Sequence, residues 1–305
     1  MQHIDAPEVW QRLPMLDAIA ALEQAIRTNG FADTPQRLHL QDDGRDLLVM
    51  PAMADGWAGV KLVSLDPQNP ARGRSFINGV YTLFVPPGLE PGASIEGRAL
   101  TELRTAAVSG LATRHLARPD ASRLTIFGAG AQGRSHLLAM AAVRDLTEVR
   151  IVAPRAESVD AFIAFAADHL EVEVRTGTPD DVATSDIVCT CTSSATPVFD
   201  GSLLPEGVHI NAIGAYRPDL QEVDAATVLA SRVIVELREA ALTEKGDLLR
   251  AAAEAGWDPG AIAADLTELL RDPGRGRMTP ADRTLFSSVG HAYEDLLIAR
   301  AVVTA

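Results

Sequence analysis

One short glycine-rich run limits the fold of this chain more than any other feature. Gly128, Gly130 and Gly133 form a G-x-G-x-x-G pattern between an apolar segment, 124–127, and an amphipathic stretch, 131–143. A strand, a tight glycine turn and a helix N-terminus together make a cradle for a pyrophosphate. The sequence therefore predicts a dinucleotide-binding turn. A purely structural glycine turn, or a site for another nucleotide-like ligand such as a methyl donor, is the alternative.

The residues assigned to this turn are Gly128, Gly130, Ala131, Gln132 and Gly133. The three glycines serve different purposes, since one makes the turn, one lets the pyrophosphate approach the backbone, and one lets the helix pack on the strand.

Strand and helix patterns alternate around and beyond this turn, which favours a doubly wound parallel sheet. Strands are predicted at 123–127, 149–152, 171–174, 186–191, 209–213 and 233–235, and helices at 131–143, 158–169 and 179–184. The first third has a helix pattern at 15–26 and 100–115 and strand patterns at 46–50, 59–63 and 80–85.

We predict an α/β fold of two domains. A Rossmann domain covers 119–283, and a smaller α/β domain covers 1–118 with 284–305. The stretch 284–299 has an amphipathic helix pattern, and this helix is expected to return to the first part of the chain.

Composition excludes several functions. Acidic residues outnumber basic ones 41 to 27 in 305 residues, and the formal charge of −14 disfavours nucleic acid and anionic membranes as partners. The chain has no apolar run long enough for a membrane span and no signal-like N-terminus, so we expect a cytoplasmic protein. The histidines and the two cysteines lack metal-binding spacing, so no metal is expected.

The end of the second strand of a Rossmann domain selects between the two nicotinamide cofactors. An acidic residue there binds the ribose 2′-OH of NAD, whereas an arginine accommodates the 2′-phosphate of NADP. The segment 152–155 has no carboxylate, and Arg155 with Ser158 can hold a phosphate. We therefore predict NADP in preference to NAD. The alternative is that Arg155 is only a solvated loop residue.

Two cations occupy positions where solvation is poor. Arg104 falls within the apolar arc of the helix pattern at 100–111, so it should meet either a protein carboxylate or an anionic substrate group. Lys61 lies inside the strand-like segment 59–63, where an ammonium can bind a carboxylate or deliver a proton. The alternative for Lys61 is an ordinary lysine on an edge strand. The alternative for Arg104 is a buried salt bridge, or a buried stem with a solvated guanidinium.

Six blocks of this sequence resemble the ornithine cyclodeaminase and μ-crystallin family. The most specific are T-x-x-R-T-A-A at 101–107 and G-A-G-A-Q at 128–132. The others are 49–53, 60–63, 210–215 and 285–290, the last running on to 294–295.

The resemblance implies a homodimer of two-domain subunits with the active site between the domains. It implies that the smaller α/β domain, 1–118 with 284–305, is the substrate-binding and dimerisation domain. It implies that Lys61 and Arg104 hold the substrate carboxylate near the nicotinamide, and that Arg37 lines the substrate pocket. It also implies that Ser288, Val289 and Gly290 lie against the nicotinamide.

One departure from the family pattern bears on the reaction. Cyclodeaminases have an aspartate after the I-G-A/G turn, whereas this chain has Tyr216. A phenol with a reference pKa near 10 is a poor base for ring closure with loss of the amine. Residues 217–219 instead resemble the μ-crystallin and bacterial imine reductase branch, so Tyr216 or Lys61 is a candidate proton donor.

We therefore expect an NAD(P)H-dependent oxidoreductase acting on C=N or CH–NH bonds, specifically a ketimine reductase. Its substrate would be a small cyclic imine carboxylate, such as 1-pyrroline- or 1-piperideine-2-carboxylate, and its product an L-amino acid. The alternatives are an amino-acid or N-(carboxyalkyl)amino-acid dehydrogenase, a cyclodeaminase-like enzyme, and a non-catalytic dinucleotide-binding protein. This hypothesis expects Lys61 and Arg104 to lack internal carboxylate partners, because their neutralisation within the protein would count against substrate binding.

Overall fold

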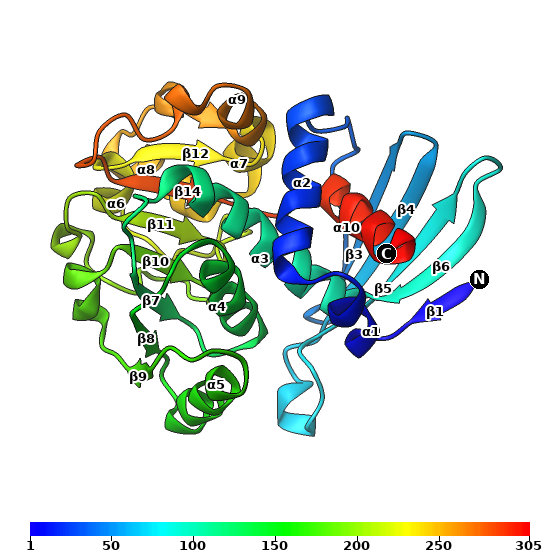
Figure 1. The fold of residues 1–305 in the computed structure, drawn as a ribbon, viewed down its shortest axis with the longest axis horizontal. Coiled ribbons are helices and arrows are strands. Elements are labelled where there is room, and N and C mark those ends of the chain that lie inside the picture. The colour runs from blue at the N-terminus through cyan, green and yellow to red at the C-terminus, as the bar shows by residue number, and fades with distance from the viewer. The chain divides into compact units, whose positions relative to one another are not determined.

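The computed structural model describes residues 1–305 except for the side chain of Pro70. Its internal contacts divide the chain into two compact units: unit 1 comprises 1–107 with 291–305, and unit 2 comprises 108–290 (Figure 1). Helix α3 (Gly97–Leu116) begins in unit 1 and ends in unit 2. The boundaries expected near 118 and 284 both fall inside unit 2.

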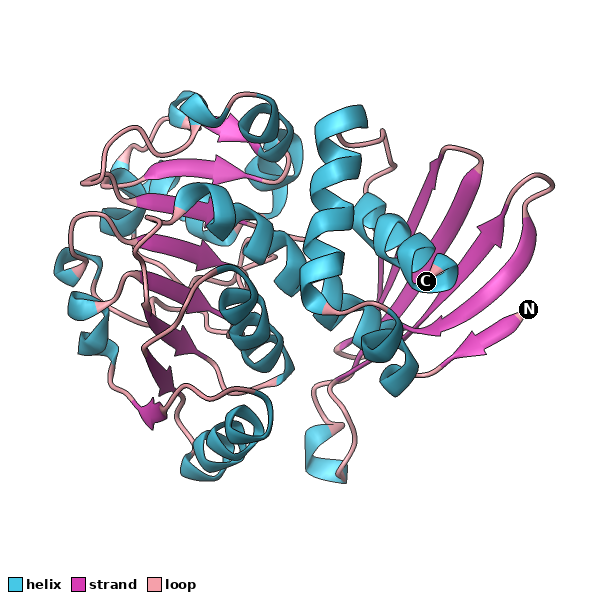
Figure 2. Ribbon diagram, in the orientation of Figure 1, coloured by secondary structure: helices cyan, strands magenta, loops and turns pink.

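Unit 1 contains a six-stranded sheet in the order β1-β6-β5-β4-β3-β2 (Figure 2). All neighbouring strands are antiparallel except β1, which pairs parallel with β6. The strands are β1 (Gln2–Ile4), β2 (Leu38–Asp42), β3 (Arg45–Ala54), β4 (Trp57–Leu65), β5 (Ile77–Val85) and β6 (Glu90–Glu96). A short 3₁₀ helix, η1 (Pro70–Arg72), lies between β4 and β5.

Helices cover one face of this sheet. Helix α10 (Ala292–Thr304) packs on β3, β4 and β5, and α2 (Met15–Asn29) packs on α10 (Figure 1). The short helix α1 (Ala6–Arg12) contacts β6 and α10. Helix α10 begins at a capping box: the His291 side chain accepts from the Tyr293 N–H, and the Glu294 side chain accepts from the His291 N–H. These bonds satisfy N–H groups that have no partner within the helix.

The pleat of the sheet sends adjacent residues to opposite faces. The covered face carries a row of directly paired residues in which Met50, Lys61 and Tyr81 follow one another across β3, β4 and β5. The opposite face carries the neighbouring row, in which Val49, Leu62 and Val80 are paired in the same way. We call these the inner row and the outer row.

Unit 2 contains an eight-stranded, all-parallel sheet in the order β13-β12-β14-β11-β10-β7-β8-β9. Starting from β7, this order is the doubly wound arrangement of a Rossmann fold, with the order reversing between β7 and β10. The predicted α/β class and Rossmann sheet are confirmed. The strands are β7 (Arg123–Phe127), β8 (Glu148–Val152), β9 (Val174–Thr176), β10 (Ile187–Thr190), β11 (His209–Ala212), β12 (Arg232–Val235), β13 (Ala264–Asp265) and β14 (Thr284–Ser287).

Helices connect these strands. They are α4 (Ala131–Val143), α5 (Ala156–His169), α6 (Ala225–Leu229), α7 (Arg238–Glu244), α8 (Gly246–Ala255) and α9 (Leu266–Arg271). Short 3₁₀ helices are η2 (Pro179–Thr184), η3 (Gly201–Leu203), η4 (Pro259–Ala261) and η5 (Pro273–Arg275).

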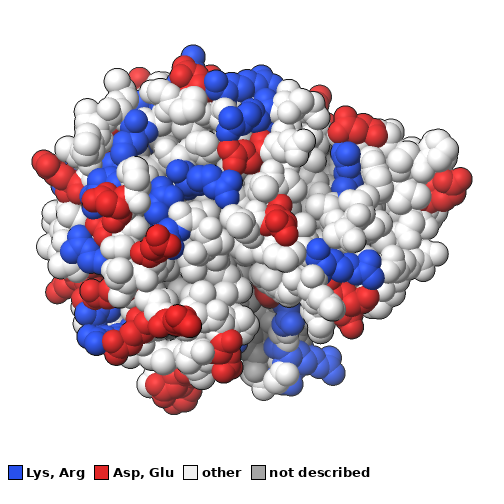
Figure 3. Space-filling model, viewed as in Figure 1, with Lys and Arg blue, Asp and Glu red and all other residues white. Residues whose placement is uncertain are grey.

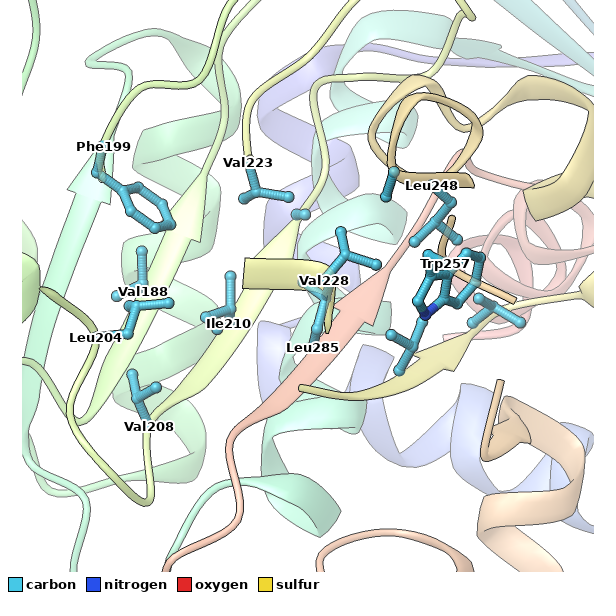
Figure 4. Close-up of a cluster of buried hydrophobic side chains, with 14 of the residues drawn as sticks. Val188, Phe199, Leu204, Val208, Ile210, Val223, Val228, Leu248, Trp257 and Leu285 are labelled. Carbon is cyan, nitrogen blue, oxygen red and sulfur yellow. The ribbon is translucent and has the colours of Figure 1, made fainter. Parts of the chain in front are cut away.

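A continuous apolar core lies on one side of this sheet. Val188, Ile210 and Leu285, from β10, β11 and β14, contribute to it together with Phe199 and Trp257 from the connections (Figure 4). Burial of such strands on both faces explains why they read as near-continuous apolar runs.

Two local predictions are wrong. The stretch 284–299 is not one helix, because residues 284–287 form strand β14 and α10 starts only at Ala292. A short apolar run does not distinguish a buried strand from a helix turn. The strand predicted at 171–174 lies further on, at Val174–Thr176.

Charged side chains of both signs are interspersed over the face of the molecule drawn in Figure 3. Among the described residues, no helix combines the length and the apolar composition needed to cross a bilayer.

Candidate active site

The glycine turn of unit 2 joins β7 to α4. Gly128 has a φ of +102°, which favours glycine, and its N–H donates to the Val152 carbonyl at the end of β8 (2.9 Å). A Cβ on Gly133 would lie 1.9 Å from the Gly128 carbonyl oxygen, whereas a Cβ on Gly130 would have no neighbour within 4 Å. Gly133 therefore permits close packing of α4, and Gly130 leaves open space at the start of that helix.

These features fit a dinucleotide. The first N–H groups of α4 have no acceptor within the helix, and they favour an anion at this end. The Oε1 atom of Gln132 is buried and makes no hydrogen bond to any residue that the structure describes. Gly128, Gly130, Ala131, Gln132 and Gly133 are therefore the residues that would hold the pyrophosphate.

The segment after β8 carries the residues predicted to select the cofactor. Arg155 is exposed and is the N-cap residue of α5, and Ser158 is half-buried in the first turn of that helix. The Arg155 carbonyl accepts from the Ser158 N–H (3.1 Å). Within the described chain, no acidic side chain is recorded in an ion pair with the Arg155 guanidinium.

A buried glutamate that the sequence analysis missed joins the carboxyl ends of β10 and β11. The Glu222 carboxylate accepts from the Thr190 hydroxyl (2.8 Å), the Thr192 N–H (2.6 Å) and the Gly214 N–H (2.5 Å). Burial raises the pKa of Glu222, and the nearby charge of Lys245 opposes that rise. These bonds fix the backbone of the turn that leads to Tyr216.

A second buried group fixes the segment Ser288, Val289 and Gly290 after β14. The Glu236 carboxylate accepts from the Ser288 hydroxyl, from the Val289 N–H (3.1 Å) and from the Gly290 N–H (2.8 Å). Lys245 donates to the Ser288 carbonyl (3.2 Å) and to the Ala212 carbonyl at the end of β11 (2.9 Å).

Lys245 also lies 3.2 Å from a carboxylate oxygen of Asp247. The Ser288 to Gly290 segment is thus held from both its N–H and its C=O groups.

In unit 1, the first turn of α10 brings the predicted cations together. Lys61 lies in the middle of β4 and is only 1% exposed, because α10 covers this face of the sheet. Arg104, on α3, is 5% exposed. Both side chains reach the first turn of α10, where Glu294 and Asp295 are fully buried.

Both cations have internal carboxylate partners. Lys61 Nζ donates to Asp295 Oδ1 (2.8 Å), Arg104 Nη1 donates to Glu294 Oε2 (3.1 Å), and Arg104 Nε lies 3.1 Å from Asp295 Oδ1. The expectation that these cations lack internal partners is therefore wrong. The physical reason is that an unpaired buried charge costs several kcal/mol, so the fold supplies counter-charges.

Pairing does not use all the donors of Lys61. An ammonium has three N–H groups, and Asp295 is the one hydrogen-bond acceptor recorded for it among the described residues. Burial lowers the pKa of Lys61 to about 8; Asp295 opposes this effect, whereas Arg104 and Arg37 reinforce it. Lys61 is thus protonated at neutral pH and close to its titration range.

Two further predicted residues, Arg37 and Tyr216, lie in different units. Arg37 directly precedes β2, is half-buried and acts electrostatically on Lys61, so the structure gathers Arg37, Lys61 and Arg104 in unit 1. Tyr216 is half-buried in unit 2, and its N–H donates to the Gly214 carbonyl (2.9 Å). The Arg217 guanidinium lies 5.8 Å from the centre of the Tyr216 ring.

The acidic partners were not identified from sequence. Glu294 and Asp295 belong to a block that resembles the family, but nothing in their own spacing assigns them to Lys61 and Arg104. An acidic pair directly before the apolar run 296–298 was the available signal. Glu236 could have been found in the same way, because it is an acidic residue directly after the apolar run 233–235.

The sheet order and the glycine turn define a Rossmann-type dinucleotide-binding protein. The chain belongs to the ornithine cyclodeaminase/mu-crystallin family, whose model matches residues 4–304. This confirms the resemblance inferred from the sequence blocks.

The relatives include reductases of the imine reductase branch and amino-acid dehydrogenases. Delta(1)-pyrroline-2-carboxylate reductase of Bacillus thuringiensis is 37% identical over 274 residues, which cover 88% of this chain and 84% of that protein. A structure of Thermococcus litoralis Delta(1)-pyrroline-2-carboxylate reductase in complex with NADH and L-proline matches with a TM-score of 0.93. It is 30% identical and covers 100% of this chain and 97% of that one.

An archaeal alanine dehydrogenase dimer with bound NAD matches with a TM-score of 0.92. It is 29% identical, and the match covers 100% of this chain and 95% of that one.

Two glycine substitutions in the turn should separate cofactor binding from folding. Gly130→Ala puts a methyl group into open space, so we expect an unchanged Tm and a dinucleotide affinity reduced by about tenfold or more. Gly133→Ala forces a Cβ against the Gly128 carbonyl, so we expect a stability loss of about 2 kcal/mol. Isothermal titration and thermal unfolding measure both effects. Unchanged dinucleotide affinity in a folded Gly130→Ala variant would contradict the assignment of the turn.

Proposed function

We propose that this chain is an NAD(P)H-dependent reductase of a small cyclic imine carboxylate of the 1-pyrroline-2-carboxylate type, giving an L-amino acid. The observation that carries the proposal is the buried Lys61 beside Arg104: Lys61 keeps N–H donors beyond its bond to Asp295, in a chain that also has a dinucleotide turn. The reductase names of its relatives support an oxidoreductase acting on C=N and CH–NH bonds.

The proposed role of Lys61 and Arg104 is to anchor the substrate carboxylate. A guanidinium and an ammonium on rigid elements hold a planar acid in one orientation, which is the main requirement for hydride transfer. The nicotinamide cofactor supplies the hydride when it is bound. The near-complete burial of both cations keeps water away and strengthens their interaction with an anion.

Reduction of a C=N bond also requires a protonated nitrogen. Lys61 is the first candidate for the donor, because its pKa of about 8 places it close to neutral pH. Tyr216 is the second candidate, and its position after the Gly214 turn is fixed by Glu222. A Tyr216→Phe variant that retains full activity would leave Lys61 as the donor.

A second reaction is favoured by the likeness to alanine dehydrogenases. The Archaeoglobus fulgidus alanine dehydrogenase is 30% identical to this chain over 297 residues, which cover 97% of the chain. Such an enzyme would reduce a linear 2-oxo acid only in the presence of ammonia. Turnover of a preformed cyclic imine without ammonia distinguishes the proposed reductase from this alternative.

The cofactor proposal is NADP in preference to NAD. It rests on Arg155 and Ser158 at the start of α5 and on the absence of an acidic residue in 152–155. The solved relatives contain NADH or NAD, so the preference is a property proposed for this chain's own loop.

We propose that the partner of this chain is a second copy of itself, which binds to the outer row of the unit 1 sheet. Leu38 and Leu62 are 60% and 37% exposed, and they lie in one row with Val49 and Val80 across four strands. Exposed apolar side chains in such a row mark an interaction surface. The alanine dehydrogenase relative is a dimer, which supports this occupant.

The activity is tested by following NADPH absorbance with 1-pyrroline-2-carboxylate and 1-piperideine-2-carboxylate. We expect Arg104→Ala to reduce kcat/KM by about 100-fold or more, because the carboxylate loses its guanidinium. Dinucleotide affinity should be unchanged. Arg98→Ala, an exposed arginine of the same helix, is the matched control and should retain activity. A folded wild-type enzyme that reduces neither imine would refute the proposal.

The cofactor preference is tested with Arg155→Ser. Loss of the guanidinium should lower kcat/KM for NADPH by about tenfold and leave that for NADH unchanged, because only NADPH has the 2′-phosphate. Arg175→Ser removes an exposed arginine that pairs with Glu173 and serves as the control. Equal losses with both cofactors would rule out a selective role for Arg155.

The dimer is tested by light scattering after gel filtration. A chain of 32.4 kDa should give about twice that mass in the wild type, and Leu62→Asp should give the monomer mass, because a charge would be buried in the interface. Asn78→Asp adds the same charge to an exposed residue of β5 outside the apolar row and should remain dimeric. A monomeric wild type at micromolar concentration would contradict the proposed interface.

A further inference from the structure

A single carboxylate oxygen in unit 1 joins two cations from different elements. Asp295 Oδ1 lies 2.8 Å from Lys61 Nζ and 3.1 Å from Arg104 Nε. Lys61 comes from the middle of β4, Arg104 from α3 and Asp295 from the first turn of α10. Asp295 is fully buried, so water does not screen this contact.

The contact determines where both cations lie. Two like charges in a dry environment repel each other strongly, and a shared anion is what holds them at hydrogen-bonding distance from a common point. The carboxylate itself is held by α10, whose start is fixed by the capping box of His291 and Glu294. The other carboxylate oxygen, Asp295 Oδ2, makes no hydrogen bond within the described chain. The recorded ion pairs of the Asp295 carboxylate are therefore those that Oδ1 makes with the two cations.

We propose that Asp295 is a positioning residue for the reductase reaction: it holds Lys61 and Arg104 as one carboxylate-binding unit and keeps Lys61 in its charged form. This inference rests on the proposed function, because it assigns the two cations to the substrate carboxylate. Asp295 acts through them and is not itself assigned a contact with substrate.

The charge state of Lys61 depends on the groups that face it. They are Asp295 from α10, Arg104 from α3, Arg37 before β2 and Tyr81 from β5. Glu294, next to Asp295 on α10, pairs with Arg104. Burial, Arg104 and Arg37 all lower the pKa of Lys61, and Asp295 is the group that raises it. Removal of the Asp295 charge should therefore let the pKa of Lys61 fall below about 8.

The neighbouring tyrosine does not titrate in this range. Burial, reinforced by the charge of Asp295, raises the pKa of Tyr81 well above its usual value. The Tyr81 hydroxyl lies over Gly59 on the same face of the sheet, where a Cβ would come within 2.0 Å of it. A group that titrates near pH 8 at this position is therefore Lys61, whose pKa is about 8, and not Tyr81.

The chain offers a direct measurement of this effect, because it contains only two lysines, Lys61 and Lys245. Protein labelled with ¹³C at the lysine Cε gives two resonances, and Lys61→Arg identifies the one that belongs to Lys61. Titration of the full-length wild type should show Lys61 deprotonating near pH 8 rather than near 10.5. In Asp295→Asn the midpoint should move to lower pH by about one pH unit or more, as expected when a contacting opposite charge is removed.

Kinetics should follow the same titration. In the wild type, kcat/KM for the imine should fall as pH rises through about 8, because Lys61 loses its proton and its charge. The fall should begin at lower pH in Asp295→Asn and should be absent in Lys61→Arg, whose guanidinium stays charged. Tyr81→Phe should retain the wild-type midpoint.

Glu294→Gln is the matched control, because it removes one charge from the adjacent residue and contacts Arg104 rather than Lys61. The Lys61 midpoint should remain near 8 in this variant. If Asp295→Asn does not fold, Asp295→Glu, which keeps the negative charge, is titrated in its place. A Lys61 midpoint that falls by about one pH unit or more in folded Asp295→Glu would overturn the proposal, because the charge is still present. An unmoved midpoint in folded Asp295→Asn, or an equal movement in Glu294→Gln, would also overturn it.

The lysine titration needs no substrate. A moved Lys61 midpoint in a protein that reduces no imine would therefore refute the proposed function and leave the electrostatic role of Asp295 intact.

Discussion

The requirement that buried charges be paired governs unit 1 of this protein. Lys61 and Arg104 are almost fully enclosed, and the protein compensates them with Asp295 and Glu294 from the start of α10. Removing one member of such a pair leaves an uncompensated charge, which typically costs about 3–5 kcal/mol. The pairing thus ties the C-terminal helix to the middle of the sheet.

The same constraint organises the Rossmann unit. Glu222, Glu236 and Lys245 are buried, and their bonds go mainly to backbone N–H and C=O groups at the carboxyl ends of β10, β11 and β14. Parallel strands leave these groups without partners where the ladders end. Charged side chains satisfy them, and so they fix the turn around Gly214 and the segment Ser288–Gly290. The family resemblance predicts that the second of these lies against the nicotinamide.

Local patterns explain why much of the fold was predictable. Strand β7, the turn at Gly128 and helix α4 follow one another directly along the chain. The order and spacing of their residues were therefore enough to predict how they are arranged. The periodicity at 100–115 predicted α3 and placed Arg104 in its apolar arc. Strand β14 was misassigned, because four buried apolar or small residues carry no periodicity that separates strand from helix.

Neighbours close along the chain specify the Rossmann class, the dinucleotide turn and the unusual positions of Lys61 in a strand segment and Arg104 in an apolar helical arc. The burial of Lys61 and the contacts of both cations depend on the tertiary structure. Lys61 and Asp295 are 234 positions apart, and Arg104 and Glu294 are 190 positions apart. Spacing along the chain carries no information about such contacts; they arise because α10 packs on β3, β4 and β5.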